Sequence, residues 1–409
     1  MTRDNIIKAA FKVWGRDLYR TTSLTELARE LGVSKPALYR HFKDKKALSD
    51  AMFTAYFEDF AAFVKGGYDR AISAENRQEG CLLMIRTMTE YYVRNREAFV
   101  FSLIQVFNSR DRKTIQNEYR IRGIDFERLV DRESGDTIYP SRMHLIMITL
   151  IFCIAHFHHT DKEFGKNPSD DLVKRTLALI ENRITKGLGL DAGKAYNLDY
   201  ERLEQQAARK VYEDTENNAL LRAVAEAVAE AGPWNASMEM VARRSGLSKS
   251  GLYAHFKNKQ DMLAQLFMTE FTRLLNYTRL QVETTEEGEE QLYLAIITIV
   301  DYLRSRPEIL VAMEWIKTRR LDLGDEAFKQ LYKTIGEIKL KAVRNQDRHF
   351  LVWIANWILF MIVNVLAWWP PTENRPDWSK VWAKNIAKIP NESFRLLFRF
   401  IALGSEGLN

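Results

Sequence analysis

Residues 23–45 read SLTELARELGVSKPALYRHFKDK, and residues 237–259 read SMEMVARRSGLSKSGLYAHFKNK. The two stretches are 214 residues apart, and the same register continues without a gap through the pairs Phe53/Phe267 and Phe57/Phe271. Each stretch has the pattern of two short helices joined at a glycine, which is typical of a helix-turn-helix. The chain is therefore predicted to carry two helix-turn-helix heads.

Local signals in the first copy indicate where its helices begin and end. Ser23 and Glu26 form the S-x-x-E pattern of a capping box, which satisfies free backbone N–H groups at a helix start. Gly32 permits a left-handed turn. Ser34 is suited to cap the next helix, and Pro36 is tolerated in its first turn. The second copy keeps this scaffold at Ala242, Gly246, Leu247, Ser248, Leu252 and Phe256.

The second helix of each copy is predicted to expose basic and aromatic side chains. In the first copy, Leu38 and Phe42 face inward, which leaves outside Lys35, Tyr39, Arg40 and His41. Such a helix suits the major groove of DNA, and the lysines just beyond it are placed to meet the phosphates. From Arg243 to Lys259 there are five Lys or Arg residues and no acidic residue. Double-stranded DNA is the predicted partner; the competing interpretation is a helical pair with a basic, solvated face.

The bulk composition fits a cytoplasmic, multidomain protein. The chain has 409 residues, 46% hydrophobic and 28% charged, which is ordinary for a globular protein of two to four domains. Its net charge of +6 mildly favours a polyanion partner. Only two cysteines occur, Cys81 and Cys153, so a disulfide framework is not expected and a reducing compartment fits. The first 14 residues follow helical spacing and lack the apolar core of a signal peptide.

The repeat extends beyond the heads. Residues 92–96, YVRNR, match residues 302–306, YLRSR, and Arg142 with its following apolar segment matches Arg348 with a longer one. Helical periodicity dominates throughout, so we predict an all-α fold of two tandem units, each a three-helix head with a helical body. The predicted domains are a first head at 1–60, a first regulatory body at 61–190, a linker at 191–216, a second head at 217–275 and a second body at 276–409.

The segments SKPALYRHFKDKKAL and SKSGLYAHFKNKQDML, each preceded by a capped helix and a glycine turn, resemble the TetR/AcrR family of bacterial repressors. The resemblance is strong over residues 1 to about 60 and about 217 to 275, and loose over the bodies. It implies homodimer-like pairing of two heads on a palindromic operator, and a body whose small-molecule effector releases the DNA. It also implies which residues face DNA: Ser23, Thr25, Ser34, Lys35, Pro36, Tyr39, Arg40, His41 and Lys45 in the first head, and Ser237, Ser248, Lys249, Ser250, Tyr253, His255 and Lys259 in the second.

The two copies differ where base reading matters. Arg40 corresponds to Ala254, and Pro36-Ala37 corresponds to Ser250-Gly251. An arginine can pair with guanine, whereas alanine offers only apolar contact. We therefore predict a pseudo-palindromic operator with two unlike half-sites, bound by a repressor that a small ligand releases. The alternative function is a ligand-binding or protein-interaction module whose degenerate heads no longer bind specific DNA.

Two apolar segments, 145–157 and 350–369, lie where the family has its dimer-forming helices. Residues 350–369 are long enough to span a membrane, but the segment contains Asn356 and Asn364, and we predict a buried interface helix instead. Each segment must bury its surface, and the other is the natural partner. The chain is therefore predicted to be a monomeric pseudo-dimer, with a homodimer carrying four heads as the alternative.

Seven of the nine tryptophans follow residue 300. They suit either core packing or an aromatic pocket for a flat or lipophilic ligand. The pocket candidates are Trp315, Trp353, Trp357, Phe107 and His156.

The sequence offers little for metal or enzyme chemistry. Cys153, His156, His158 and His159 form a cluster, but a zinc site would need further ligands and no CxxC is present. No nucleophile elbow, phosphate loop or dinucleotide fingerprint occurs. We therefore expect no metal, no cofactor and no enzymatic activity.

Overall fold

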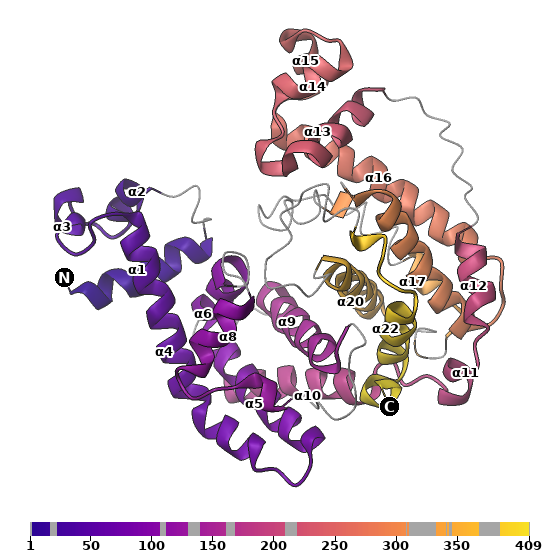
Figure 1. Cartoon of the computed structure of the whole chain (residues 1–409), viewed down its shortest axis with the longest axis horizontal. Coiled ribbons are helices and arrows are strands. Elements are labelled where there is room, and N and C mark those ends of the chain that lie inside the picture. The colour runs from indigo at the N-terminus through magenta and orange to yellow at the C-terminus, as the bar shows by residue number, and fades with distance from the viewer. Residues whose placement is uncertain are drawn as a thin grey trace. The chain divides into compact units, whose positions relative to one another are not determined.

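The computed structural model describes residues 2–16, 23–106, 112–129, 140–160, 168–208, 219–307, 309–310, 333–340, 342, 346–367 and 385–408. Every regular element in these ranges is a helix, which confirms the all-α prediction (Figure 1). Contacts divide the chain into two compact units. The first comprises 1–137, 150–181 and 373–375, and the second comprises 138–149, 182–372 and 376–409.

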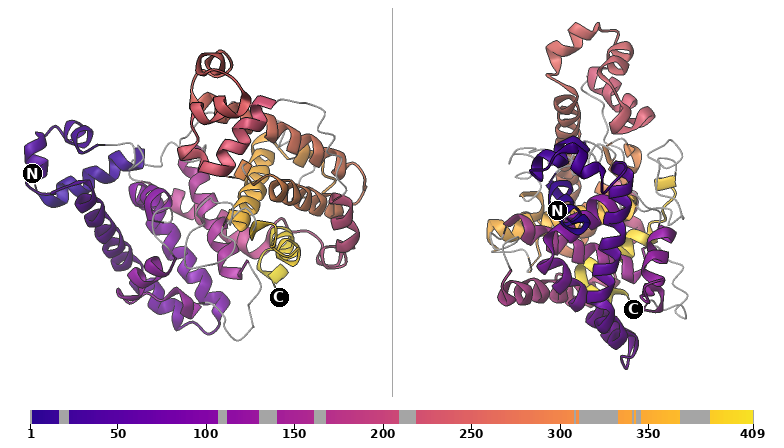
Figure 2. Two further views of the ribbon diagram at one scale, coloured as in Figure 1. Left: turned by 45° about the horizontal axis from the view of Figure 1, so that its top comes forward. Right: turned by 90° about the vertical axis from the view of Figure 1, so that its left-hand side faces the viewer.

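Unit 1 starts with three head helices gathered around the amino end of a long fourth helix (Figures 1 and 2). Its elements are α1 (Arg3–Arg16), α2 (Leu24–Glu30), α3 (Lys35–Tyr39), α4 (Lys45–Ile72), α5 (Arg77–Arg94), α6 (Arg96–Phe101), the π-helix η1 (Ser102–Val106), α8 (Arg112–Arg120) and the 3₁₀ helix η2 (Phe126–Leu129).

Aromatic side chains form the core of the body of unit 1, where α4 packs along α5. The Tyr56 hydroxyl lies 2.8 Å from that of Tyr92 and 3.2 Å from that of Tyr119, and all three side chains are buried. Burial raises the pKa of all three phenols. Because each hydroxyl has a partner, this polar cluster is compatible with an apolar interior.

Helices α9 (Arg142–Thr160) and α10 (Asp170–Lys186) each contribute to both units. Unit 2 further contains α11 (Ala192–Tyr196), α12 (Tyr200–Ala207), α13 (Ala219–Asn235), α14 (Met238–Ser245), α15 (Lys249–His255), α16 (Lys259–Val282), α17 (Gly288–Ser305), α20 (Arg348–Ala367), α22 (Glu392–Leu403) and the 3₁₀ helix η3 (Gly404–Leu408). Its head helices α13, α14 and α15 lie at the amino end of α16, as α1, α2 and α3 do at α4 (Figure 1).

The apolar helix α20 is long and apolar enough to cross a membrane, with a mean hydropathy of 2.2, but 67% of that apolar stretch is buried in the protein. Helices α17 and α22 pack against it. Trp357, Met361 and Val365 are completely enclosed. This burial is what a core helix of a folded domain shows, and it agrees with the predicted buried helix.

Segments of the first repeat pack on helices of the second repeat inside unit 2. The Thr149 hydroxyl of α9 donates to the Met361 sulfur of α20 at 3.5 Å. The Leu188 backbone N–H donates to the Ile401 carbonyl of α22 at 2.8 Å. The backbone at Gly187 approaches so closely that an added Cβ would lie 2.4 Å from that same carbonyl. The core of unit 2 is therefore built from both repeats.

Residues 191–216 were expected to form a linker, and the part that the structure describes is folded. Helix α12 packs on α17. Its Glu204 carboxylate accepts hydrogen bonds from the Tyr293 hydroxyl at 2.6 Å and from two nitrogens of Arg395 at 2.7 and 2.9 Å. Burial alone would raise the pKa of Glu204, but these hydrogen bonds outweigh it and lower that pKa. The paired carboxylate thus anchors α12 to the second body.

Candidate nucleic-acid interface

The first head has the caps that its sequence predicts. The Ser23 backbone N–H donates to Glu26 Oε2 at 2.6 Å, and the Glu26 N–H donates to Ser23 Oγ at 3.1 Å, so the capping box is complete. Gly32 has a φ of 63°, in the left-handed region. The Ala37 N–H donates to Ser34 Oγ at 3.3 Å and opens α3. Together these contacts fix the angle between α2 and α3.

Helix α3 separates an apolar side from a polar side. Leu38 is completely buried and Phe42 nearly so, whereas Tyr39 is 43% exposed. The Lys35 ammonium lies 5.8 Å from the centre of the Tyr39 ring, a cation–π arrangement that keeps both side chains on the outer face. Eight of the predicted DNA-facing residues are exposed: Ser23, Thr25, Ser34, Lys35, Pro36, Tyr39, Arg40 and His41.

Lys45 differs from the other predicted contacts because it is half-buried at the start of α4. Burial lowers the pKa of its ammonium, although the nearby Glu26 carboxylate opposes this shift. The neighbouring Lys43 and Lys46 are exposed and more accessible to a phosphate group.

The second head repeats the scaffold. The Met240 N–H donates to Ser237 Oγ at 3.2 Å, and the Gly251 N–H donates to Ser248 Oγ at 3.0 Å. Gly246 ends α14 with a φ of 68°. The two heads therefore share the same caps and the same turn at equivalent positions.

The outer face of the second head is also formed by the predicted residues. Those exposed are Ser248, Lys249, Ser250, Tyr253 and His255, whereas Ser237 and Lys259 are half-buried. Tyr253 is 47% exposed, close to the value of its counterpart Tyr39. The Ser248 and Ser250 hydroxyls lie 3.0 Å apart, so Ser250 supports the cap while remaining on the surface.

One residue on this face was not among the predicted contacts. Glu239, in the first turn of α14, lies with Oε1 2.5 Å from Lys249 Nζ at the start of α15. The hydrogen bond from Lys249, followed by those from its own N–H and from Ser237, lowers the pKa of Glu239 to about 2. Its counterpart in the repeat is Thr25, which was predicted, so the register alone points to this position.

The described members of the predicted ligand set belong to different units. Trp353 and Trp357 of α20 are stacked, with ring centres 5.6 Å apart, and both are buried in unit 2. His156 belongs to unit 1, where its ring lies beside those of Phe152 and Phe157. Phe107 and Trp315 lie outside the described residues. The stacking and burial of the two tryptophans fit core packing, and their role as ligand contacts stays a prediction.

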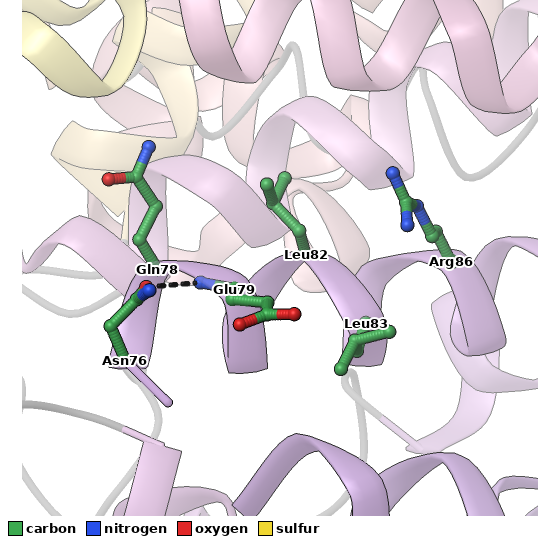
Figure 3. Close-up of a pocket in the computed structure, with 6 residues that line it drawn as sticks. All are labelled: Asn76, Gln78, Glu79, Leu82, Leu83 and Arg86. Atoms are coloured by element: carbon green, nitrogen blue, oxygen red, sulfur yellow. Dashed lines mark hydrogen bonds between the residues drawn. The ribbon is translucent and has the colours of Figure 1, made fainter. Parts of the chain in front are cut away.

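A hollow of about 430 Å³ lies along the start of α5 (Figure 3). It is lined by Asn76, Gln78, Glu79, Leu82, Leu83 and Arg86. The Glu79 N–H donates to Asn76 Oδ1 at 2.9 Å, so part of the lining is a helix cap. Ligand pockets are mostly apolar, whereas four of these six side chains are polar, and none of them was a predicted ligand residue.

The cysteine and histidine cluster of α9 has aromatic neighbours. The His158 ring stacks on Phe99 with the two rings 6° from parallel and their centres 4.8 Å apart, while Cys153 is buried. Within the ranges that the structure describes, no three His, Cys, Asp or Glu residues are grouped to hold a metal ion. His156 and His158 therefore contact aromatic rings of the first body.

Comparison with known proteins bears on both heads. The family profile described as "Bacterial regulatory proteins, tetR family" matches residues 6–52 and again 220–266, ranges that keep the 214-residue register. The chain is similar to the "Fatty acid metabolism regulator protein" of Bacillus subtilis (strain 168), with 22% identity over 179 residues that cover 36% of this chain and 92% of the relative.

Two further likenesses are partial. The chain is 28% identical over 90 residues to the "HTH-type transcriptional activator FasR" of Mycolicibacterium smegmatis; the match covers 22% of this chain and 41% of that relative. Among solved structures, the fatty acid degradation regulator FadR from Bacillus halodurans aligns with 45% of this chain and 98% of its own, at a TM-score of 0.32 and 16% identity. A likeness this weak supports no structural argument.

The turn between α2 and α3 yields a test by matched substitutions. Nothing lies within 4 Å of a Cβ added at Gly32, so Gly32→Ala adds only the strain of a left-handed alanine. We expect the opening free energy of α2 and α3 to fall by about 1 kcal/mol. Gly66 is exposed inside α4, where alanine is more favourable than glycine by about 0.5–1 kcal/mol. Gly66→Ala should therefore raise the free energy of opening α4. Amide hydrogen exchange measures both, and equal effects would contradict the turn assignment.

Proposed function

Because the chain belongs to the tetR family of bacterial regulatory proteins, as a tandem duplication, we propose that it is a cytoplasmic repressor whose two unlike heads read one pseudo-palindromic operator. The observation that carries the proposal is the pair of exposed, basic and aromatic faces on α3 and α15, set on the same capped scaffold. Such faces combine phosphate contacts with groups that reach base edges.

The difference between Arg40 and Ala254 supports unlike half-sites. Both side chains are exposed at equivalent positions of the two heads. A guanidinium that pairs with guanine contributes about 1–3 kcal/mol of discrimination, whereas an alanine methyl contributes no hydrogen bond. The half-site bound by the first head should therefore carry a guanine that the other half-site lacks.

Selection of bound DNA from a random pool tests this assignment. We expect two linked half-sites of different sequence, with Arg40→Ala reducing discrimination at one guanine of the first half-site about tenfold. The matched variant Ala254→Arg should make the second half-site more like the first. Two identical half-sites, or an Arg40→Ala effect spread evenly over both, would contradict the proposal.

The alternative, a module with degenerate heads, predicts a different response to salt. A protein that neutralises several phosphates loses affinity steeply as salt rises, because counterions are released on binding. The exposed Lys35, Arg40 and Lys43 support the hypothesis that the first head binds DNA. If the protein binds the selected DNA weakly, and no more tightly than a random duplex, the alternative is favoured instead.

We further propose that one chain takes the place of a homodimer. Support comes from unit 2, where Thr149 of the first repeat contacts Met361 of the second and Arg142 donates to the Leu408 carbonyl at 3.2 Å. The apolar surface of α20 is largely covered within a single chain. This cover supports a monomer.

Light scattering tests this proposal directly. A single chain has a mass of 47.7 kDa, and we expect that mass for the free protein and one chain in each operator complex. A particle of twice this mass at micromolar concentration would favour the homodimer with four heads.

Thr149→Glu, which puts a charge against buried Met361, should destabilise the fold by several kcal/mol, whereas exposed Glu201→Ala in α12 should not.

The effector is proposed to be a small lipophilic molecule of the fatty-acid class. The support is the name of the Bacillus subtilis relative, which is a fatty acid metabolism regulator and is matched over 92% of its length. We expect micromolar palmitate, or its coenzyme A thioester, to release the operator, as measured by loss of fluorescence anisotropy. Unchanged anisotropy with both, or equal release by a sub-micellar detergent of the same chain length, would exclude this class.

A further inference from the structure

The outer faces of the two heads differ in charge at equivalent positions. These positions are Thr25, Lys35 and Arg40 in the first head and Glu239, Lys249 and Ala254 in the second. Two cations and a neutral residue in the first head are thus replaced by one cation, one anion and a neutral residue. Over these three positions the net charge falls from +2 in the first head to zero in the second, so this part of the second face attracts phosphates less strongly.

The added anion is held in a defined place. Glu239 lies in the first turn of α14 and Lys249 begins α15, so their ion pair at 2.5 Å joins the two helices of the motif. Both side chains are more than half exposed, at 54% and 59%. The low pKa of Glu239, held at about 2 chiefly by Lys249, means that its carboxylate is charged at neutral pH.

Stability does not explain this arrangement. An exposed ion pair contributes little to folding because solvent screens it. A carboxylate on a face that approaches phosphates also opposes binding. Its position is useful to the protein if the carboxylate contacts a hydrogen-bond donor of the DNA, and the major groove offers such donors on the exocyclic amino groups of the bases.

The carboxylate has capacity for that contact. Lys249, the Glu239 N–H and Ser237 donate to it. An ionised carboxylate has about four acceptor positions, which leaves room for one further donor. Glutamate accepts from N4 of cytosine, and that amino group is a distinctive donor of a C·G pair in the major groove.

We propose that Glu239 is a base-reading residue of the second head, accepting a hydrogen bond from N4 of a cytosine while Lys249 holds its carboxylate in place. This inference rests on the proposed function, that the second head binds duplex DNA. In the first head the equivalent residue is Thr25, and within the described ranges no carboxylate pairs with Lys35. A cytosine preference of this origin is therefore confined to one half-site.

The test uses the full chain and the operator obtained by selection. Every base is placed in turn at each position of the second half-site, and dissociation constants are measured by fluorescence anisotropy. We expect the wild type to prefer cytosine about tenfold at one position, and E239T to lose that preference. Threonine is the residue that the first head carries at this position, and matching thermal melts show that the variant is folded.

The control is T25A, the change at the equivalent position of the first head. It should leave the preference in the second half-site unaltered. An E239T variant that keeps the cytosine preference, or that binds all sequences more tightly by one common factor, overturns base reading by Glu239. If T25A also loses the cytosine preference in the second half-site, that preference does not come from Glu239 alone. Failure of the wild type to bind any duplex overturns the proposed function, and this inference with it.

Discussion

Helix α20 is apolar on all its sides, so it is stable only where other helices enclose it. The cover comes from α17 and α22 of the second repeat, and Thr149 of α9 in the first repeat adds a contact to Met361. At about 25 cal/mol for each Å² of apolar area buried, this enclosure is a leading contribution to stability. The close backbone contacts of Gly187 with the Phe400 and Ile401 carbonyls are a further place where the two repeats meet inside unit 2.

The repeats have diverged in their interiors while keeping complementary partners. Tyr92 and Tyr302 occupy equivalent positions in the two repeats, and so do Tyr56 and Glu270. In the first body Tyr56 meets Tyr92 hydroxyl to hydroxyl at 2.8 Å, whereas in the second body the Tyr302 hydroxyl donates to the Glu270 carboxylate at 2.7 Å. Arg273, at 2.9 Å, compensates that buried charge. A substitution of this kind survives only where the same copy supplies the new partner, because an unpaired buried carboxylate costs several kcal/mol.

Short-range signals made the heads predictable, and long-range contacts limited the rest. Serine caps and left-handed glycines act on residues three or four positions away, so Ser23, Gly32 and Ser34 could be assigned from sequence alone. The attachment of α12 to the second body involves Glu204 meeting Arg395, a partner far along the chain that no local pattern reveals. For Trp353 and Trp357 the sequence left core packing and a ligand pocket open, because the choice depends on which side chains surround them; in the structure the two rings are stacked and buried.

Covalent linkage changes what a reading face can become. In a homodimer every substitution on that face is present in both heads. A carboxylate like that of Glu239 would therefore weaken phosphate binding at both half-sites. In a tandem chain the first head, with Lys35 and Arg40 exposed, keeps its positive charge. Once that head is bound, the second is held near the DNA at a high effective concentration, which offsets a weaker intrinsic affinity. On the proposed function, the second head can then exchange electrostatic attraction for discrimination between bases, with the Glu239–Lys249 ion pair at the contact.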